Sequence, residues 1–396
     1  MRDDRQPLAF GARASGTLAV YALAHGAVDA ACVGTLWSAY HSGVLGSRAA
    51  WSAFFLYNLL AFAVQPLIGL GADRLRAVRP LAAGGGALTT AVAVAVAGIP
   101  GAAFVAVAAL GLGNAVFHVG GGVLSLKAAP GKATPLGVFV APGAAGVVAG
   151  TLVGRAGGPA WLFALALVPL AAGVLVLPAP RFGRASRPTG KEAPAADEDQ
   201  RLAGSEARPL RVAGGAAAGI ELIVLLLLFV VAVRAYVGMA VVLPWKSDAW
   251  LLAGLTAGVV FGKALGGVLA DRLGWRAVGV SALLISIPLL ALGPSSAAAG
   301  IVGTFVFNMT MPITLVAVAH ALHGHEGFAF GLTCLALFVG SAPVLIGGPG
   351  ISTATLVPAA VIAAGALWVG LGRLLPRPAT YGRAMRTPAA LEKGLE

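Results

Sequence analysis

The sequence of 396 residues has few charged side chains: charged residues make up 11% of it and hydrophobic residues 58%. A soluble domain usually carries about 25% charged residues, so this composition excludes an ordinary soluble protein. Apolar stretches of about twenty residues recur along the chain, each long enough to cross a bilayer as a helix. The short alternating segments of a membrane β-barrel are missing. We therefore predict an all-α polytopic membrane protein.

Cysteine is also scarce. Cys32 and Cys334 are the only two, and both fall in apolar stretches, which excludes a disulfide framework and a cysteine-based zinc site. The sequence has no phosphate-binding loop, HExxH zinc motif or nucleophile–base pair. We therefore expect no enzyme, no cofactor and no ATPase, and a transport process that is driven by a gradient or by the substrate itself.

The net charge of +12 could suggest a nucleic-acid partner, but the positions of the basic residues argue against one. They gather in the loops and tails between apolar spans, as expected for cytoplasmic loops. With both termini in the cytoplasm, 22 of the 27 Lys and Arg residues fall on the cytoplasmic side, three fall outside and two lie within spans. This distribution predicts an integral protein of the cell (plasma or inner) membrane, in contact with its lipids and without nucleic acid.

A polar stretch divides the apolar spans into six and six. We therefore predict an N-terminal six-helix bundle over 1–180, a cytoplasmic linker over 181–211, and a C-terminal six-helix bundle with a cytoplasmic tail over 212–396. The expected spans are 15–37, 48–70, 80–99, 103–126, 134–154, 160–179, 220–244, 250–270, 277–293, 298–320, 327–348 and 353–374.

One loop pattern occurs twice, between the second and third span of each half. The copies share a Gly, an Asp and a following Arg and lie 198 residues apart, half the chain length. Internal repeats of this kind are typical of secondary transporters. The residues concerned are Gly69, Asp73 and Arg74 in the first copy, and Gly267, Asp271 and Arg272 in the second.

The repeated loop resembles the G-x-L-A-D-[RK]-x-G-[RK] signature of the major facilitator superfamily. The second copy fits well, whereas the first has Gly71 in place of Leu and Arg76 in place of the second Gly. The resemblance implies twelve helices in two pseudo-symmetric six-helix bundles that work by alternating access. It also implies that Asp73 and Asp271 take part in closing the cytoplasmic side, while the glycines allow close helix contact.

Polar side chains lie near the middle of several spans, where they are costly and by default mark function. In the major facilitator family, spans 1, 4, 7 and 10 line the central cavity, and six of the seven polar side chains named below lie in these spans. We expect His25 and Asp29, four residues apart on span 1, to couple transport to protons. The expected substrate-binding residues are Asn114, His118, Arg234, Lys263 and Asn308.

The charge of the expected cavity favours an anionic or amphipathic organic solute, because Arg234 and Lys263 exceed the single acid Asp29. Asp29 and Arg234 could also pair across the two halves. For Asn114 and Asn308, a hydrogen bond between helices is the structural alternative. We expect a proton-coupled transporter that acts as a monomer on a small-molecule substrate.

Two further resemblances bear on the transport mode. Gly113, Phe117 and His118 resemble the G-x-x-x-F-H element of transporters like the fosmidomycin resistance protein, and the Gly/Pro pattern over 137–150 loosely resembles an element of exporters. Both resemblances favour efflux. For the Gly/Pro pattern over 137–150, tight packing of helices through small residues is an equally good explanation. One alternative is a transition-metal transporter that uses His25, Asp29, Cys32 and His118; another is a lipid-handling transporter.

Overall fold

The computed structural model describes residues 12–75, 79–99, 101–158, 161–177, 216–347 and 350–375, and the regular segments in these ranges are all helical. Ten helical spans are long and apolar enough to cross a membrane, and two shorter apolar helices, Pro80–Val96 and Trp161–Val176, accompany them. In order and position these match the twelve predicted spans. The predicted linker over 181–211 lies outside the described residues.

The first six spans form one group of helices. They are α1 (Ala12–His41), the combined segment of α2 (Ser47–Asn58), η1 (Leu59–Ala63) and α3 (Gln65–Arg74), and then α4 (Arg79–Val96), α5 (Ala103–Ala128), α6 (Thr134–Arg155) and α7 (Trp161–Val176).

The last six spans form a second group. They are α9 (Ala216–Ala240), α10 (Ala249–Leu273), α11 (Trp275–Leu292), the broken span of α12 (Ala297–Asn308) and α13 (Thr310–Ala321), α14 (Glu326–Leu345) and α15 (Thr353–Leu374), with the short η3 (Pro244–Ser247) between α9 and α10.

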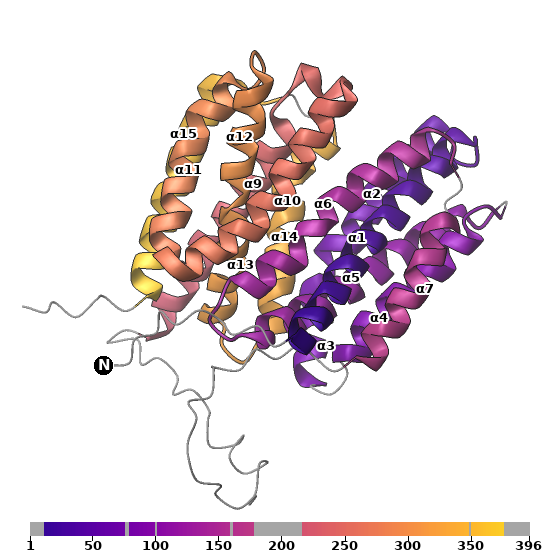
Figure 1. Ribbon diagram of the computed structural model, residues 1–396, viewed down its shortest axis with the longest axis horizontal. Helices are drawn as coiled ribbons and strands as arrows, with labels where there is room; N and C mark the ends of the chain where they lie inside the picture. Colours follow the sequence, from indigo (N-terminus) through magenta and orange to yellow (C-terminus); the bar gives the residue numbers. More distant parts are fainter. Residues whose placement is uncertain are drawn as a thin grey trace, which may run out of the picture.

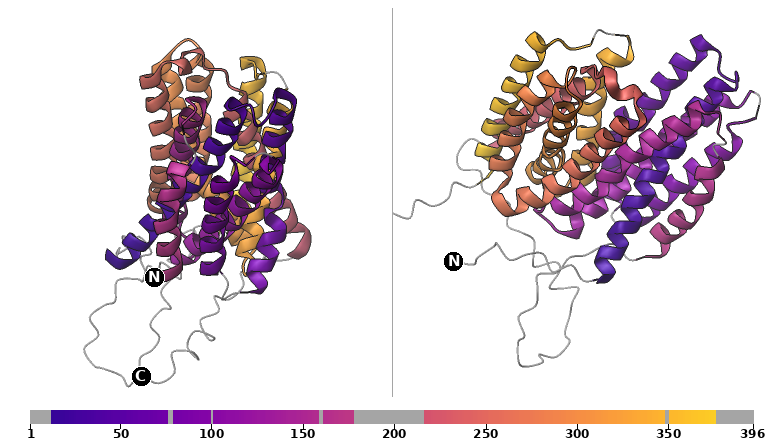
Figure 2. Two further views of the ribbon diagram at one scale, coloured as in Figure 1. Left: turned by 90° about the vertical axis from the view of Figure 1, so that its right-hand side faces the viewer. Right: turned by 45° about the horizontal axis from the view of Figure 1, so that its top comes forward.

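The two groups lie side by side and lean apart (Figures 1 and 2). They meet at the end where α3 and α10 terminate, which we call the closed end, and separate towards the opposite end, which we call the open end. The principal contacts between the groups are α3 with α14 and α6 with α10.

Glycines allow these two contacts to be close, as expected for helices packed in a membrane. Gly69 on α3 lies directly against the main chain of Gly327 on α14. A Cβ at Gly137 on α6 would lie 2.7 Å from the carbonyl oxygen of Lys263, and one at Gly267 on α10 would lie 2.7 Å from that of Ala133. Side chains at these positions would push the groups apart.

Glycines farther along α6 pack within the first group. Gly146 and Gly150 lie against the main chain of Gly26 and Ala30 on α1. The glycine pattern that resembles an exporter element therefore has a packing function here, and it carries no information on direction by itself.

Two spans are interrupted in ways that the hydropathy pattern does not reveal. In the second span the helix widens to a π-helical segment, Leu59–Ala63, just before Pro66. Proline has no N–H to continue the hydrogen-bond ladder, and such local widening is common at functional positions. In the tenth span α12 ends at Asn308 and α13 begins at Thr310, two residues before Pro312.

Candidate functional site

Two equivalent contacts join the groups of helices at the closed end. The carboxylate of Asp73 accepts hydrogen bonds from the main-chain N–H groups of Gly327 and Phe328, both at 2.8 Å, at the start of α14. The carboxylate of Asp271 accepts from the N–H groups of Ala133 and Thr134, both at 2.8 Å, at the start of α6. Each signature aspartate therefore caps a helix of the opposite group.

The physical basis of these contacts is the unsatisfied N–H groups and partial positive charge at a helix N-terminus. An ion pair between Lys127 and Glu326 (3.6 Å) also crosses this end. The signature arginines Arg74 and Arg272 are exposed, and neither forms an ion pair within the described parts of the chain.

A buried polar cluster lies between α1 and α5. It consists of His25 and Asp29 on α1 and Asn114 and His118 on α5, and none of the four is more than 9% exposed. Asn114 donates from Nδ2 to Asp29 Oδ1 at 2.9 Å. Asp29 Oδ2 lies 3.2 Å from His25 Nε2, and Asp29 Oδ1 lies 3.8 Å from His118 Nε2. We call these four residues the His–Asp cluster.

The surrounding main chain sets the protonation pattern of both imidazoles. The Nδ1 of His25 lies 2.8 Å from the carbonyl oxygen of Phe139, and the Nδ1 of His118 lies 2.8 Å from that of Asn114. A carbonyl oxygen only accepts, so both Nδ1 atoms must carry hydrogen. The two Nε2 atoms face each other at 2.8 Å. That contact is a hydrogen bond only when one of them is also protonated.

The cluster also has the donor atoms of a metal site. Ligand atoms of His25, Asp29 and His118 all lie within 4.8 Å of one another. Two imidazole nitrogens on one tetrahedral zinc ion would be about 3.3 Å apart, wider than the observed 2.8 Å. The observed spacing therefore fits a shared proton better. Cys32, predicted as a fourth ligand, lies outside this group, and its Sγ is 4.0 Å from Asn114 Nδ2.

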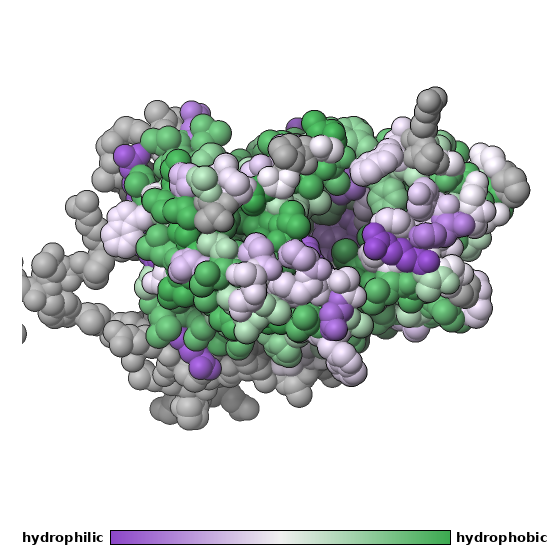
Figure 3. All heavy atoms as spheres, turned by 90° about the horizontal axis from the view of Figure 1, so that it is seen from above, coloured by the Kyte–Doolittle hydropathy of each residue, from purple (hydrophilic) through white to green (hydrophobic). Residues whose placement is uncertain are grey.

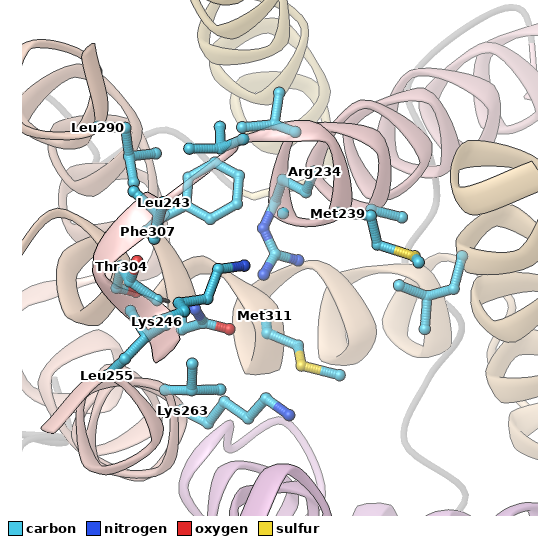
Figure 4. A pocket seen from close by; sticks show the side chains of 17 residues that line it. Arg234, Met239, Leu243, Lys246, Leu255, Lys263, Leu290, Thr304, Phe307 and Met311 are labelled. Atoms are coloured by element: carbon cyan, nitrogen blue, oxygen red, sulfur yellow. Dashed lines mark hydrogen bonds between the residues drawn. The ribbon is translucent and has the colours of Figure 1, made fainter. Parts of the chain in front are cut away.

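A cavity of about 320 Å³ lies within the second group of helices (Figure 4). Its polar lining comprises Arg234 on α9, Lys246 on η3, Lys263 on α10, and Thr304 and Asn308 on α12, and neither Asp nor Glu lines it among the described residues. Apolar side chains form the rest. Viewed onto the open end, the molecule is hollowed between the two groups, with hydrophilic side chains around the hollow (Figure 3).

Arg234 is the most deeply buried of these cations, at 6% exposed. Its Nε has no hydrogen-bond partner in the part of the chain that the structure describes, and its guanidinium carbon lies 5.4 Å from the ring centre of Phe307. The predicted pair between Asp29 and Arg234 is not formed, because Asp29 is held by His25 and Asn114 instead. Asn114 and His118, predicted as substrate ligands, belong to the His–Asp cluster and do not line this cavity.

Lys263 connects the cavity with the first group of helices. Its Nζ donates to the carbonyl oxygen of Val140 on α6 at 3.3 Å. The neighbouring carbonyl, that of Phe139, accepts from His25. Two successive main-chain carbonyls of α6 therefore hold one cation from the cavity and one imidazole from the His–Asp cluster.

Lys246 is a lining residue that the sequence placed in an outer loop. Lys246 as a whole is exposed at the mouth of the cavity, but its ammonium group points into the cavity (Figure 4). Partial burial lowers the pKa of Lys246 from its usual value. Lys246 is one of the few basic residues on the open side and lies just after α9, and this position was the sequence feature that could have identified it as a lining residue.

Comparison with known proteins supports the fold. No family model and no curated protein matches the sequence. Among solved structures, a variant of the E. coli fucose:proton symporter FucP matches with a TM-score of 0.63 at 13% identity, over 92% of this chain and 99% of that one. FucP in the outward conformation, a transporter of the major facilitator superfamily, matches with a TM-score of 0.52 at 11% identity, over 90% of this chain and 100% of that one.

A variant of the nucleoside transporter NupG also matches, with a TM-score of 0.50 at 13% identity, over 91% of this chain and 99% of that one. The likeness spans nearly the whole of every chain compared and includes both groups of helices. The resemblance of α5 to the fosmidomycin-resistance group stays a prediction. The chain has the fold of the transporters of the major facilitator superfamily.

Proposed function

We propose that this protein is a secondary active transporter that moves a small organic anion across the membrane by alternating access, coupled to protons. The observation that carries the proposal is the pairing of two features. A buried His–Asp cluster needs one proton to complete its hydrogen bonds, and a cavity beside it is lined by cations, with no acid among the described lining residues.

Alternating access requires contacts that hold one end shut and can be released. Asp73 and Asp271, with Gly69 and Gly267 beside them, form such contacts in equivalent positions. The excess of Lys and Arg in the loops at this end assigns it to the cytoplasm. The conformation described here is then closed to the cytoplasm and open to the outside, with the exposed Arg74 and Arg272 facing the cytoplasmic surface.

The His–Asp cluster supplies the coupling. With Asp29 ionised and one proton between His25 and His118, the cluster is electrically neutral. Loss of that proton leaves two lone pairs facing each other and a buried carboxylate without a cation, both unfavourable in a low dielectric. The side chains must then move apart, so proton release changes the packing of α1 against α5.

Lys263 links this change to the solute. An anion in the cavity competes with the carbonyl of Val140 for the Lys263 ammonium, because a charge-assisted bond is the stronger one. Release of Val140 alters the segment of α6 that also holds His25. Occupancy of the two sites is thereby coupled through one short stretch of main chain. We favour efflux as the direction, from the resemblance of Gly113, Phe117 and His118 on α5 to an element of the fosmidomycin-resistance group.

The proposal is tested with purified protein in liposomes that contain a pH-sensitive dye. Addition of small organic anions should move protons across the membrane, and a pH gradient should drive accumulation of a transported anion. Glu221→Gln removes an exposed carboxylate of α9 and serves as a control that should behave as wild type. Proton-independent movement of every solute would contradict the coupling.

Transport of a transition metal is the second candidate, because three ligand-type atoms lie within 4.8 Å. Uptake of zinc or manganese in the same liposomes, without a response to organic anions, would replace the first proposal with this one.

A further inference from the structure

We propose that the transported solute is a small organic dianion with an apolar body, bound with its two negative charges shared between Arg234 and Lys263. This inference rests on the proposed function and specifies its substrate class. The observations behind it are the charge of the cavity lining, the lack of a partner for Arg234, the placement of the two cations and the chemistry of the remaining walls.

The charge balance favours two negative charges. Three cations line the cavity and no acid does among the described residues. The nearest buried carboxylate, Asp29, is engaged by His25 and Asn114. Unbalanced charges are costly where water is scarce. A monoanion would leave one of the two deep cations, Arg234 or Lys263, uncompensated, whereas a dianion balances both.

Arg234 is prepared for an anionic ligand. It is more than nine-tenths buried, its Nε is unsatisfied, and its guanidinium points into the cavity (Figure 4). A planar guanidinium binds a carboxylate or a phosphonate with two parallel hydrogen bonds. The described residues supply no such partner, so the anion has to come from the solute.

Lys263 is the second anchor and lies on a different helix. Among the described residues its only hydrogen bond is the 3.3 Å contact with the Val140 carbonyl, which is long and neutral and therefore easily exchanged for a charged acceptor. Both cations line the same cavity, and in Figure 4 Met311 lies between the guanidinium of Arg234 and the ammonium of Lys263. One solute can thus contact both cations.

The other walls select the body of the solute. Leu243, Leu255, Leu290, Phe307 and Met311 line the cavity, and such surfaces favour apolar groups. A volume of about 320 Å³ is at the small end for ligand sites. Lys246 stands at the mouth, where an exposed cation attracts anions from solution and is balanced by water or counterions. A third charge on the solute is not required.

The first experiment varies the charge of the ligand and leaves the protein unchanged. Binding of adipate, its monomethyl ester and its dimethyl ester is measured by calorimetry on purified full-length protein, at a pH where both carboxyl groups of adipate are ionised. A second comparison uses phenylphosphonate and its monomethyl ester. In phenylphosphonate both negative charges lie on one phosphonate group, whereas in adipate they lie on two separate carboxylates. We expect each dianion to bind about tenfold tighter than its monoester, or more.

Variants then locate the two charges. Lys263→Gln should reduce the affinity for adipate to that of the monoester while changing the affinity for the monoester by less than about threefold. Arg234→Gln should weaken the binding of both. Arg373→Gln, which changes an exposed arginine at the end of α15, should leave the preference for the dianion unchanged. Unfolding temperatures of all variants identify any that fail to fold, and the ester comparison on wild type needs no variant.

Equal affinity for adipate and its monoester, together with equal affinity for phenylphosphonate and its monoester, would overturn the inference. If monoanions are then transported with protons, the proposed function stands and only the dianion is wrong. If no anion binds and a pH gradient drives a neutral solute instead, the anionic substrate of the proposed function fails as well.

Discussion

The Nε2 atoms of His25 and His118 lie 2.8 Å apart, while both Nδ1 atoms are committed to main-chain carbonyls. Because a carbonyl only accepts, the two imidazoles cannot both be neutral and still form this hydrogen bond. Asp29 lies beside both Nε2 atoms, where its carboxylate would balance an additional proton. A contact between α1 and α5 is thereby made dependent on a proton.

His118→Gln should uncouple transport from protons. Glutamine cannot take up the proton that bridges the two imidazoles, so gradient-driven accumulation should be lost while exchange of solute across the membrane continues. The measurement compares both activities in liposomes. His323→Gln removes an exposed histidine after α13 and should retain both. Normal accumulation in His118→Gln would show that the bridging proton is not the coupled one.

Arg234→Met should separate binding from stability. Removing a buried charge that has no partner relieves a desolvation cost, so the unfolding temperature should stay the same or rise. Affinity for organic anions should fall about tenfold or more, because a charge-assisted hydrogen bond is lost. The matched control is Arg272→Met, which changes an exposed arginine. If Arg234→Met lowers the unfolding temperature while the folded variant binds anions with normal affinity, the role of Arg234 is structural.

Gly69→Ala and Gly71→Ala provide a matched pair at the closed end. A Cβ at Gly69 would collide with the main chain of Gly327, whereas one at Gly71 meets nothing within 4 Å. The first substitution should favour opening of this end and slow transport, and the second should be silent. Accessibility of this end to a thiol reagent, with a cysteine at exposed Leu75, measures the effect. The native cysteines are both buried, so background labelling is low.

Asp73→Ala and Asp271→Ala should each weaken closure by removing a helix cap. Loss of a cap costs about 1 kcal/mol, which changes the ratio of closed to open molecules by roughly fivefold. Spin labels on Leu75→Cys and Leu273→Cys, two exposed positions on opposite groups, report the distance across the closed end. We expect a larger share of long distances in each variant and the largest in the double variant. An unchanged distribution would contradict the capping role.

The sequence predicted the helices and their order well, because the length and hydropathy of each span are local properties of the chain. The equivalence of Asp73 and Asp271 was also visible, since both copies of the loop keep the aspartate. The breaks at Leu59–Ala63 and at Met309 were missed, because a proline-related distortion leaves the average hydropathy unchanged.

The site was harder to predict because it depends on how helices face one another. Spacing placed His25 and Asp29 on one face of α1, and Asn114 and His118 on one face of α5. The alternative of a metal site already placed His118 beside His25 and Asp29, but spacing along each helix could not decide whether the two faces meet, and Asn114 and His118 were predicted as substrate ligands. The pair that Asp29 and Arg234 could have formed is absent among the described contacts, since opposite charges gave no information on which helices are adjacent.

Asp29→Asn tests the central claim most directly. Asparagine keeps the shape of Asp29 but cannot balance a proton shared by His25 and His118. Gradient-driven accumulation and counterflow exchange of the same organic anion are measured in liposomes, with Glu221→Gln as the control for loss of a carboxylate. We expect Asp29→Asn to abolish accumulation and to leave exchange in place. Accumulation at the wild-type rate in this variant would contradict proton coupling through the His–Asp cluster.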